Sequence, residues 1–327
     1  MSEYDLLFDA MGSHVRLLIG EPSYGQPQPE EAGEEVRRFI GEFDRALSRF
    51  REDSELCNLN GDRRERVPAS ALMRKAVRAG IWAAERSGGL VDPTLVGEIE
   101  AAGYRESRAG VQGVPLGEAL AEAPAREPAR PAPNSRWRHI VVSEYDGTIA
   151  RPPGLRFDTG GTGKGLAADI AADMLAGYSR FVVDCGGDIR IGGPDALVRP
   201  FDVQVEHPLT GERAHVLRLS SGGVATSGLN VRIWRRPDGC YAHHLLDPAT
   251  GRPAWTGLVG ATALADTTLE AETLSKAALL SGPEGGRRLL GDRGGLLVHE
   301  TGRVELVGPL SVRPRLRLMP HEERAAA

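Results

Sequence analysis

The chain has 327 residues, enough for one large domain or two fused ones with a buried core, which excludes a disulfide-stabilised miniprotein. Apolar residues make up 41% of the sequence and charged residues 26%, and there is no run of about 18 apolar residues, so we expect no membrane-spanning segment. Forty basic and 45 acidic residues leave a net charge of -5 without a basic stripe, which argues against a nucleic-acid partner. The N-terminal segment lacks the pattern of a secretory signal peptide, so we expect a cytoplasmic protein.

Two residue types are scarce enough to be informative. The three cysteines, Cys57, Cys185 and Cys240, are widely spaced and form no CxxC pair, so the sequence predicts free thiols rather than a disulfide framework or a zinc site. Lysine occurs only three times, at Lys75, Lys164 and Lys276. Subtracting these three from the 40 basic residues leaves 37 arginines, so a lysine inside a motif is an exception.

The N-terminal third of the sequence predicts one strand and two helices. Loose alternation that ends at Gly20 indicates a strand around residues 15–19. Apolar residues recur at three- and four-residue steps over residues 34–50, which is the pattern of an amphipathic helix. A second helix is expected over residues 70–86, because its apolar positions keep one register and two glycines follow its end.

A change of composition separates these elements from the second half of the chain. Residues 121–134 are rich in proline and alanine without apolar periodicity, so residues 105–136 are expected to form a surface loop or linker. Further strands are predicted at residues 138–142, 148–151, 201–206, 216–219, 242–246, 258–265, 295–299 and 304–307, and helices at about 164–177, 268–281 and 283–291. Strands and helices mix without regular βαβ alternation, which favours an α+β fold over a doubly wound parallel sheet.

The segment FDTGGTGKG, residues 157–165, is a glycine-rich loop that leads into a predicted helix. Backbone N–H groups at a helix N-terminus have no partner inside the helix, so such a loop can bind phosphate. It is not a P-loop, because Asp158 stands where that motif needs glycine and Gly165 follows Lys164 where it needs serine or threonine. It is not a dinucleotide fingerprint either, because Leu166 takes the place of the third glycine. A plain turn and helix cap also explains the loop, and the rarity of lysine favours a functional interpretation.

Two further regions combine predicted strands with residues that can carry chemistry. In VDCGGDIRIGG, residues 183–193, paired glycines follow an apolar strand, which fits either a bulge or the close approach of a ligand. VATSG, residues 224–228, precedes YAHHLLDPATGRP, residues 241–253. On a regular strand His243 and His244 point to opposite faces, so one of them should point inward. An inward histidine is either a hydrogen-bonded core residue or a general base, and the spacing does not decide between the two.

Residues 263–283 combine a strand with a helix whose start has capping-box spacing, Thr267 followed by Glu270. Glu272 and Lys276 lie four residues apart on one face of this helix. The ordinary interpretation is a surface ion pair that stabilises the helix by about 0.2–0.5 kcal/mol.

In this order, these segments resemble the ApbE family of FAD:protein FMN transferases, and three N-terminal segments join the resemblance. Met11-Gly12-Ser13 is similar to the family's opening Met-Gly-Thr, residues 50–60 to its Ser-Glu-Leu-x-x-x-Asn segment, and residues 88–97 to its Phe-Asp-Pro-Thr segment. The resemblance covers most of the chain, and six motifs in one order are far more specific than any single one.

The resemblance implies an ApbE-type α+β fold with mixed or antiparallel sheets and flanking helices. Residues 1–104 and 137–312 would belong to one domain, with residues 105–136 as a loop or linker and residues 313–327 as a C-terminal tail. The implied activity is Mg²⁺-dependent: the enzyme cleaves the pyrophosphate of FAD and passes FMN to a Thr or Ser hydroxyl of a target flavoprotein, with release of AMP. The implied partners are FAD and a cytosolic acceptor protein.

The resemblance also assigns roles to individual residues. Positions that line the flavin or adenine part of FAD correspond to Met11, Phe50, Val91, Asp92 and Pro93. Asp158 and Lys164 match FAD-contacting positions, where Lys164 would neutralise pyrophosphate charge, and Leu246 completes the expected binding set. His244 matches the histidine that deprotonates the acceptor hydroxyl, a group whose very high pKa requires such a base.

The sequence departs from the family at the metal positions. The family helix usually places Asp and, four residues later, Thr as Mg²⁺ ligands, whereas this chain has Glu272 and Lys276. Glutamate can still offer oxygen, but a protonated lysine cannot bind a cation. A carbonyl of Gly161 or Gly163 and the hydroxyl of Ser275 could complete a weakened site, or the Lys276 ammonium could take the place of the metal. We therefore expect weaker Mg²⁺ dependence than in the family.

Two other functions stay open on the sequence alone. One is a pyrophosphatase that hydrolyses FAD to FMN and AMP, with water in place of the acceptor hydroxyl. The other is a non-catalytic FAD-binding carrier, which the altered metal positions favour. A flavin oxidoreductase is disfavoured, because the sequence has no dinucleotide fingerprint.

Overall fold

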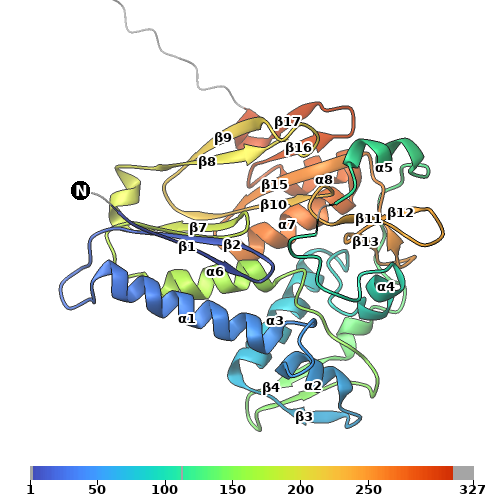
Figure 1. Cartoon of the computed structure of the whole chain (residues 1–327), viewed down its shortest axis with the longest axis horizontal. Coiled ribbons are helices and arrows are strands. Elements are labelled where there is room, and N and C mark those ends of the chain that lie inside the picture. The colour runs from blue at the N-terminus through green and yellow to red at the C-terminus, as the bar shows by residue number, and fades with distance from the viewer. Residues whose placement is uncertain (1–2, 112, 312–327) are drawn as a thin grey trace, which may run out of the picture.

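The computed structural model describes residues 3–111 and 113–311, and an eight-stranded sheet forms its centre (Figure 1). The strands in spatial order are β1 (Tyr4–Ala10), β2 (Ser13–Ile19), β6 (Phe181–Cys185), β7 (Asp188–Gly192), β10 (Gly222–Gly228), β15 (Leu258–Ala265), β16 (Gly295–His299) and β17 (Val304–Val307). Every neighbouring pair in this sheet is antiparallel, which confirms the α+β fold class. No helix in residues 3–111 and 113–311 is long and apolar enough to cross a membrane, and the cytoplasmic location stays a prediction.

Helices cover one face of the sheet. Helix α6 (Gly163–Met174) packs on β6 and β7, α7 (Thr268–Leu280) packs on β10 and β15, and α1 (Pro29–Leu47) lies against α6 and β1 (Figure 1). The other helices are α2 (Glu55–Gly61), α3 (Ala71–Arg86), α4 (Val96–Ala101), α5 (Leu116–Glu122), α8 (Gly282–Leu290) and the short 3-10 helices η1 (Arg136–His139), η2 (Pro194–Leu197) and η3 (Gly308–Ser311). Helix α7 is buried on almost every side, because the sheet, α3, α6 and α8 all pack against it.

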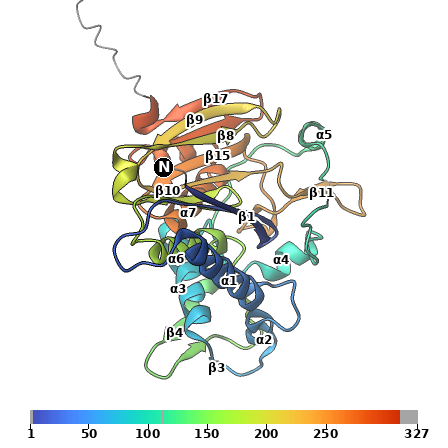
Figure 2. The ribbon, with the colours of Figure 1, turned by 60° about the vertical axis from the view of Figure 1, so that its left-hand side comes forward.

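A hairpin covers the opposite face of the sheet. It consists of β8 (Phe201–Glu206) and β9 (Arg213–Leu219), which are drawn above β10 in Figure 1 and Figure 2. Successive side chains of a strand point to opposite faces, so Val183 packs into the core under the helices while Val182 packs with Phe201 of the hairpin.

Smaller strand pairs surround these layers. The strands are β3 (Arg66–Pro68), β4 (Val141–Ser143), β5 (Thr148–Ala150), β11 (Ile233–Arg235), β12 (Tyr241–His243), β13 (Leu246–Asp247) and β14 (Arg252–Pro253). The first three form a sheet in the order β3-β5-β4, while β11 pairs with β12 and β13 with β14.

Two tight turns from distant parts of the chain meet at one end of the sheet. Strand β2 pairs with β6 in the register Val15↔Cys185, which brings the β1–β2 turn beside the β6–β7 turn. A Cβ atom on Gly186 would lie 2.5 Å from the Ser13 hydroxyl oxygen, and Gly186 also has a φ of +64°, so only glycine fits there. The end of β10 reaches the same edge, because Ala225 pairs with Asp188 and the strand continues to Gly228.

Most predicted elements are confirmed to within a few residues, but two differ. The strand predicted over residues 138–142 begins only at Val141, because residues 136–139 form η1 around the buried Trp137. The strand predicted over residues 242–246 ends at His243 and pairing resumes in β13. Both differences arise in short segments where packing of neighbouring side chains overrides strand propensity.

The segment predicted as a surface loop or linker, residues 105–136, contains helix α5 and several buried side chains. Leu116, Ala119 and Ala129 are almost fully buried. The Ala129 N–H donates to the Leu280 carbonyl (2.8 Å). A backbone group of this segment is therefore paired with another part of the chain, and such a contact leaves no periodic pattern in the sequence. The division of the chain into domain parts stays a prediction, and residues 313–327, the expected tail, lie outside the described residues.

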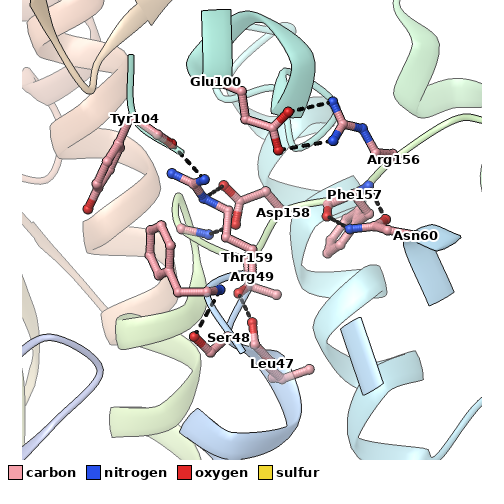
Figure 3. Close-up of polar contacts among 12 residues, drawn as sticks. Leu47, Ser48, Arg49, Asn60, Glu100, Tyr104, Arg156, Phe157, Asp158 and Thr159 are labelled. Atoms are coloured by element: carbon pink, nitrogen blue, oxygen red, sulfur yellow. Dashed lines mark hydrogen bonds and ion pairs between the residues drawn. The ribbon is translucent and has the colours of Figure 1, made fainter. Parts of the chain in front are cut away.

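Asn60, near the end of α2, holds the strand-like segment that leads into the glycine loop (Figure 3). Its Oδ1 accepts from the Phe157 N–H (2.7 Å), and its Nδ2 donates to the Phe157 carbonyl (2.8 Å). The ring of Phe157 is buried against Gly80 of α3, where a Cβ would lie 2.6 Å from its Cζ atom. One side chain therefore fixes both backbone groups of the residue before Asp158.

Replacing Asn60→Ala should lower the free energy of unfolding by about 1–3 kcal/mol, because two backbone groups lose their partners. Urea unfolding measured by circular dichroism checks this value. Asn58→Ala is the matched control, since Asn58 lies in the same helix with an exposed side chain. Equal midpoints for the two variants would contradict the anchoring role of Asn60.

Candidate active site

A pocket of about 740 Å³ opens at the end of the sheet where the two turns meet. Its wall combines the β1–β2 turn, the chain after α1, the segment before α4, the glycine loop, the end of β10 and the chain after β12. Of the residues predicted for the site, those that line the pocket are Met11, Phe50, Val91, Asp92, Pro93, Asp158, Gly161, Lys164, His244, Leu246 and Lys276. Glu272 and Ser275 do not line it, because both are fully buried behind the wall.

Three N–H groups where the glycine loop enters α6 have partners within the protein. The Thr162 and Gly163 N–H groups donate to the Thr159 carbonyl (3.0 and 2.7 Å), and the Gly165 N–H donates to Glu272 Oε2 (2.8 Å). The carboxylate of Glu272 thus occupies the position beside a helix N-terminus that favours an anion. The anion beside the Gly165 N–H therefore belongs to the protein itself, and phosphate binding by the rest of the loop stays a prediction.

Asp158 contacts Arg49, in the segment after α1 (Figure 3), and both residues line the pocket. Arg49 Nε lies 3.3 Å from Asp158 Oδ2, and its Nη1 donates to the Tyr104 carbonyl (2.8 Å). Its guanidinium carbon lies 4.2 Å from the centroid of the Phe50 ring and 4.6 Å from that of Tyr104. The buried arginine therefore holds two aromatic rings at the pocket, and Phe50, 38% exposed, offers a face on which a flat ring system can stack.

The sequence did not single out Arg49 or Tyr104. With 37 arginines in the chain, no property of Arg49 distinguishes it except its place beside Phe50. Tyr104 lies at the boundary that the sequence marked as the start of a loop. Their contact joins the segment after α1 to the segment after α4, which spacing along the chain does not reveal.

Asp92 offers one engaged and one unengaged oxygen to the pocket. Its Oδ1 accepts from the N–H and the hydroxyl of Thr94 (2.8 and 2.6 Å). Its Oδ2 is buried and has no hydrogen-bond partner within residues 3–111 and 113–311. Burial raises the pKa of Asp92, although Thr94 and Arg136 oppose the shift.

Two lysines line the pocket, and each is paired with a buried carboxylate. Lys164 Nζ lies 2.7 Å from Asp188 Oδ2, and Lys276 Nζ lies 2.8 Å from Glu272 Oε1. Burial alone would lower the pKa of Lys164, but the carboxylates of Asp188 and Glu272 outweigh it and raise the pKa to about 12. Burial raises the pKa of Glu272, and Lys276 and Lys164 oppose that rise. The prediction that Glu272 and Lys276 form a surface pair is therefore wrong, because α7 is enclosed by its neighbours.

The residues at the expected metal positions do not fit Mg²⁺. Both oxygens of Glu272 have partners, Lys276 on Oε1 and Gly165 on Oε2, and the side chain is 0% exposed. Ser275 is equally buried and its hydroxyl is bonded to Ser227 Oγ (2.8 Å) and the Glu272 carbonyl (3.0 Å). A cation that approached Glu272 from the pocket would meet the ammonium of Lys276 first, because Lys276 lines the pocket and Glu272 does not. Within the described ranges, no group of three His, Cys, Asp or Glu side chains is placed to hold a metal ion.

His244 lies on the pocket wall as a neutral imidazole. Its Nδ1 is 3.4 Å from the Arg232 carbonyl, and because a carbonyl only accepts, Nδ1 carries the proton and Nε2 keeps a free lone pair. Burial, together with the positive charges of Lys276, Arg232 and Lys164, lowers the pKa of His244 to about 3, although the bond to the carbonyl opposes the shift. The lone pair on Nε2 of this neutral ring can accept a proton, and so low a pKa makes the ring a weaker base than a free histidine.

His243 is the inward histidine of the pair and belongs to the core. It is 0% exposed, its Nδ1 accepts from the Leu245 N–H (3.3 Å), and its ring lies edge-on to Trp255 at 4.7 Å. Burial and the neighbouring His244 lower the pKa of His243 to about 3. Its position beneath the pocket wall packs the segment that carries His244.

The neutral state of His243 predicts a pH dependence of stability. An unfolded histidine binds a proton below pH 6.5 while the folded one stays neutral, so stability falls as pH drops from about 6.5 toward 3. Each such histidine contributes a slope of up to about 1.4 kcal/mol per pH unit. Urea unfolding between pH 7.5 and 4.5 should therefore give a shallower slope for His243→Phe than for the unmodified protein. The same change at the exposed His139 is the control, and an unchanged slope in His243→Phe would contradict this assignment.

Comparison with known proteins places the chain in one family. The model of the ApbE family matches residues 11–298. The FAD:protein FMN transferase of Escherichia coli K12 is 27% identical over 294 residues, which cover 88% of this chain and 81% of that protein. The protein of the same name from Haemophilus influenzae is 28% identical over 269 residues, which cover 78% of this chain and 74% of that protein.

A solved structure supports the same assignment. The crystal structure of the ApbE protein from Thermotoga maritima is similar with a TM-score of 0.77 and 26% identity, covering 94% of this chain and 97% of that one. The apo form of the Pseudomonas stutzeri flavinyl transferase ApbE shares the fold, with a TM-score of 0.73, 24% identity and coverage of 94% and 96% of the two chains. The family model spans most of the sequence, including the glycine loop and the pocket-lining histidine, and the chain belongs to the ApbE family.

Proposed function

We propose that this protein is an FAD:protein FMN transferase, which moves FMN from FAD to a Thr or Ser hydroxyl of an acceptor protein and releases AMP. The observation that carries the proposal is the neutral His244 on the same pocket wall as two lysines. The names of the relatives from E. coli and H. influenzae support it. The pocket volume of about 740 Å³ lies within the range of about 300–1,000 Å³ that is usual for sites of this kind.

The proposed reaction uses groups that the pocket provides. The acceptor oxygen attacks the phosphorus of the FMN half, the O–P bond forms as the bond to the AMP oxygen breaks, and the hydroxyl proton passes to Nε2 of His244. A hydroxyl needs such a base, because its own pKa lies far above neutrality. Charge accumulates on the phosphoryl oxygens, and the ammonium groups of Lys164 and Lys276 stabilise it from fixed positions.

The aromatic side of the pocket fits the flat part of the substrate. Phe50 is held by Arg49 and exposes part of its ring to the pocket. The predicted binding residues Met11, Val91 and Pro93 line the same cavity with apolar surface. An extended molecule with a planar ring at one end and phosphates at the other would contact both the aromatic side and the lysines.

Mass spectrometry of the protein incubated with FAD and an acceptor domain that carries a flavinylation-type Thr tests the proposal. We expect a covalent FMN adduct on the acceptor together with an equal amount of AMP. His244→Ala should lower the rate by about 10²–10⁴-fold with little change in FAD affinity, because the imidazole is needed for proton transfer. His139→Ala is the control for the loss of an exposed histidine.

Three outcomes would contradict the proposal in different ways. AMP with free FMN would show a pyrophosphatase, in which water replaces the acceptor. FAD that stays bound and intact would show a carrier. If His244→Ala formed the adduct at the normal rate, the role of His244 as the base would be rejected, while the transferase activity would be confirmed.

A further inference from the structure

Two lysines present positive charge to the pocket, and the carboxylates that pair with them lie behind its wall. Lys164 and Lys276 line the pocket, with side chains 30% and 12% exposed. Their carboxylate partners, Asp188 and Glu272, are 1% and 0% exposed. A phosphate group beside these lysines therefore meets two ammonium groups, and the wall separates it from Asp188 and Glu272.

Both lysines are held so that they need little rearrangement to bind an anion. Lys164 Nζ contacts Asp188 Oδ2 at 2.7 Å and donates to the Gly186 carbonyl at 3.3 Å. Lys276 Nζ donates to Glu272 Oε1 at 2.8 Å. An ammonium group has three donors, so each lysine keeps at least one for a ligand. Fixing a long lysine side chain usually costs rotamer entropy when it binds a ligand. Here folding has already restricted both side chains, so binding loses less of that entropy.

Glu272 needs Lys276 for its own burial. A carboxylate with no exposed surface is strongly destabilising unless a cation and further donors accompany it. Here the Gly165 N–H and the Lys276 ammonium provide this compensation. A divalent cation could reach Glu272 from the pocket only after Lys276 had moved away, which would leave the lysine beside the metal with like charge.

We infer that Lys276, beside Lys164, binds a phosphate group of the substrate directly and takes the place of a divalent cation in this protein. The inference rests on the proposed function for the identity of the substrate, a flavin dinucleotide. Glu272 is a positioning residue, because it fixes Lys276 without touching the pocket. In the transfer step the two ammonium groups keep their protons and only stabilise charge on the phosphoryl oxygens.

Isothermal titration with FAD and with riboflavin, in the absence of an acceptor, tests the inference. Riboflavin has the same ring system and no phosphate, so it reports on the aromatic side of the pocket alone. With EDTA the protein should bind FAD with a Kd within about twofold of its value in excess Mg²⁺. Lys276→Met should weaken FAD binding by about tenfold or more and leave riboflavin binding unchanged, because a charge-assisted contact is lost.

Two further variants make the test decisive. Lys75→Met is the matched control, since Lys75 is the third lysine, is exposed and lies on α3 outside the pocket wall. If Lys276→Met does not fold because Glu272 loses its partner, the double variant Glu272→Gln and Lys276→Met removes both charges and keeps an acceptor for the Gly165 N–H. We expect the double variant to bind riboflavin normally and FAD about tenfold or more weakly.

The outcomes separate this inference from the proposed function. A Kd for FAD that improves more than about tenfold with Mg²⁺, or full FAD affinity in the double variant, would overturn the inference. Transfer of FMN that stops with EDTA would overturn it as well, while confirming the transferase. FAD binding that depends on Lys276 and not on Mg²⁺, with no adduct on any acceptor, would support the inference and reject the proposed function.

Discussion

The buried carboxylate of Glu272 is the constraint on which the rest of the site depends. A Cβ atom on Gly165 would lie 2.8 Å from Glu272 Oε2 and 2.8 Å from the Thr268 carbonyl, so only glycine lets α6 approach α7 this closely. The two helices cap each other: Glu272 of α7 accepts from the Gly165 N–H, and Asp169 of α6 accepts from the N–H groups of Thr268 and Leu269 (2.8 and 2.9 Å). This reciprocal contact fixes the start of α6 and, with it, the glycine loop and Lys164.

The charges of this contact also determine the state of the histidine. Burial of Glu272 requires Lys276, and the ammonium of Lys276, together with that of Lys164, disfavours a proton on His244. The same lysines that stabilise charge on a phosphate therefore keep the nearby imidazole neutral. Their negative partners do not cancel this effect in the pocket, because Asp188 and Glu272 lie behind the wall.

Local motifs in the sequence predicted single segments of the site, but they did not predict the contacts between those segments. The glycine loop and the helix that carries Glu272 were expected from residue type and spacing, and both are present, whereas the paired glycines 186 and 187, interpreted as a bulge or a ligand contact, form a turn. Spacing alone also predicted that Glu272 and Lys276 pair. Whether that pair is exposed depends on what packs around α7, and the sheet, α3, α6 and α8 all do so.

Long-range contacts account for the remaining differences. The N–H of Gly165 appeared free to bind phosphate because its partner, Glu272, lies 107 positions further along the chain. The pairing of β2 with β6, which joins the two turns at the pocket, likewise has no local signal. Arg49 and Tyr104 are recognised as residues of the site only from their contact in the folded structure. Sequence patterns describe single elements, whereas the burial of a charge depends on the whole assembly.

A crystal structure of the FAD complex grown with Mn²⁺ tests the central claim most directly, because Mn²⁺ binds at Mg²⁺ sites and is located by its anomalous scattering. The account predicts Lys276 Nζ within hydrogen-bond distance of both Glu272 and a phosphate oxygen, with no anomalous peak between them. An anomalous peak that contacts Glu272 and the phosphates, with the Lys276 side chain turned away, would contradict it.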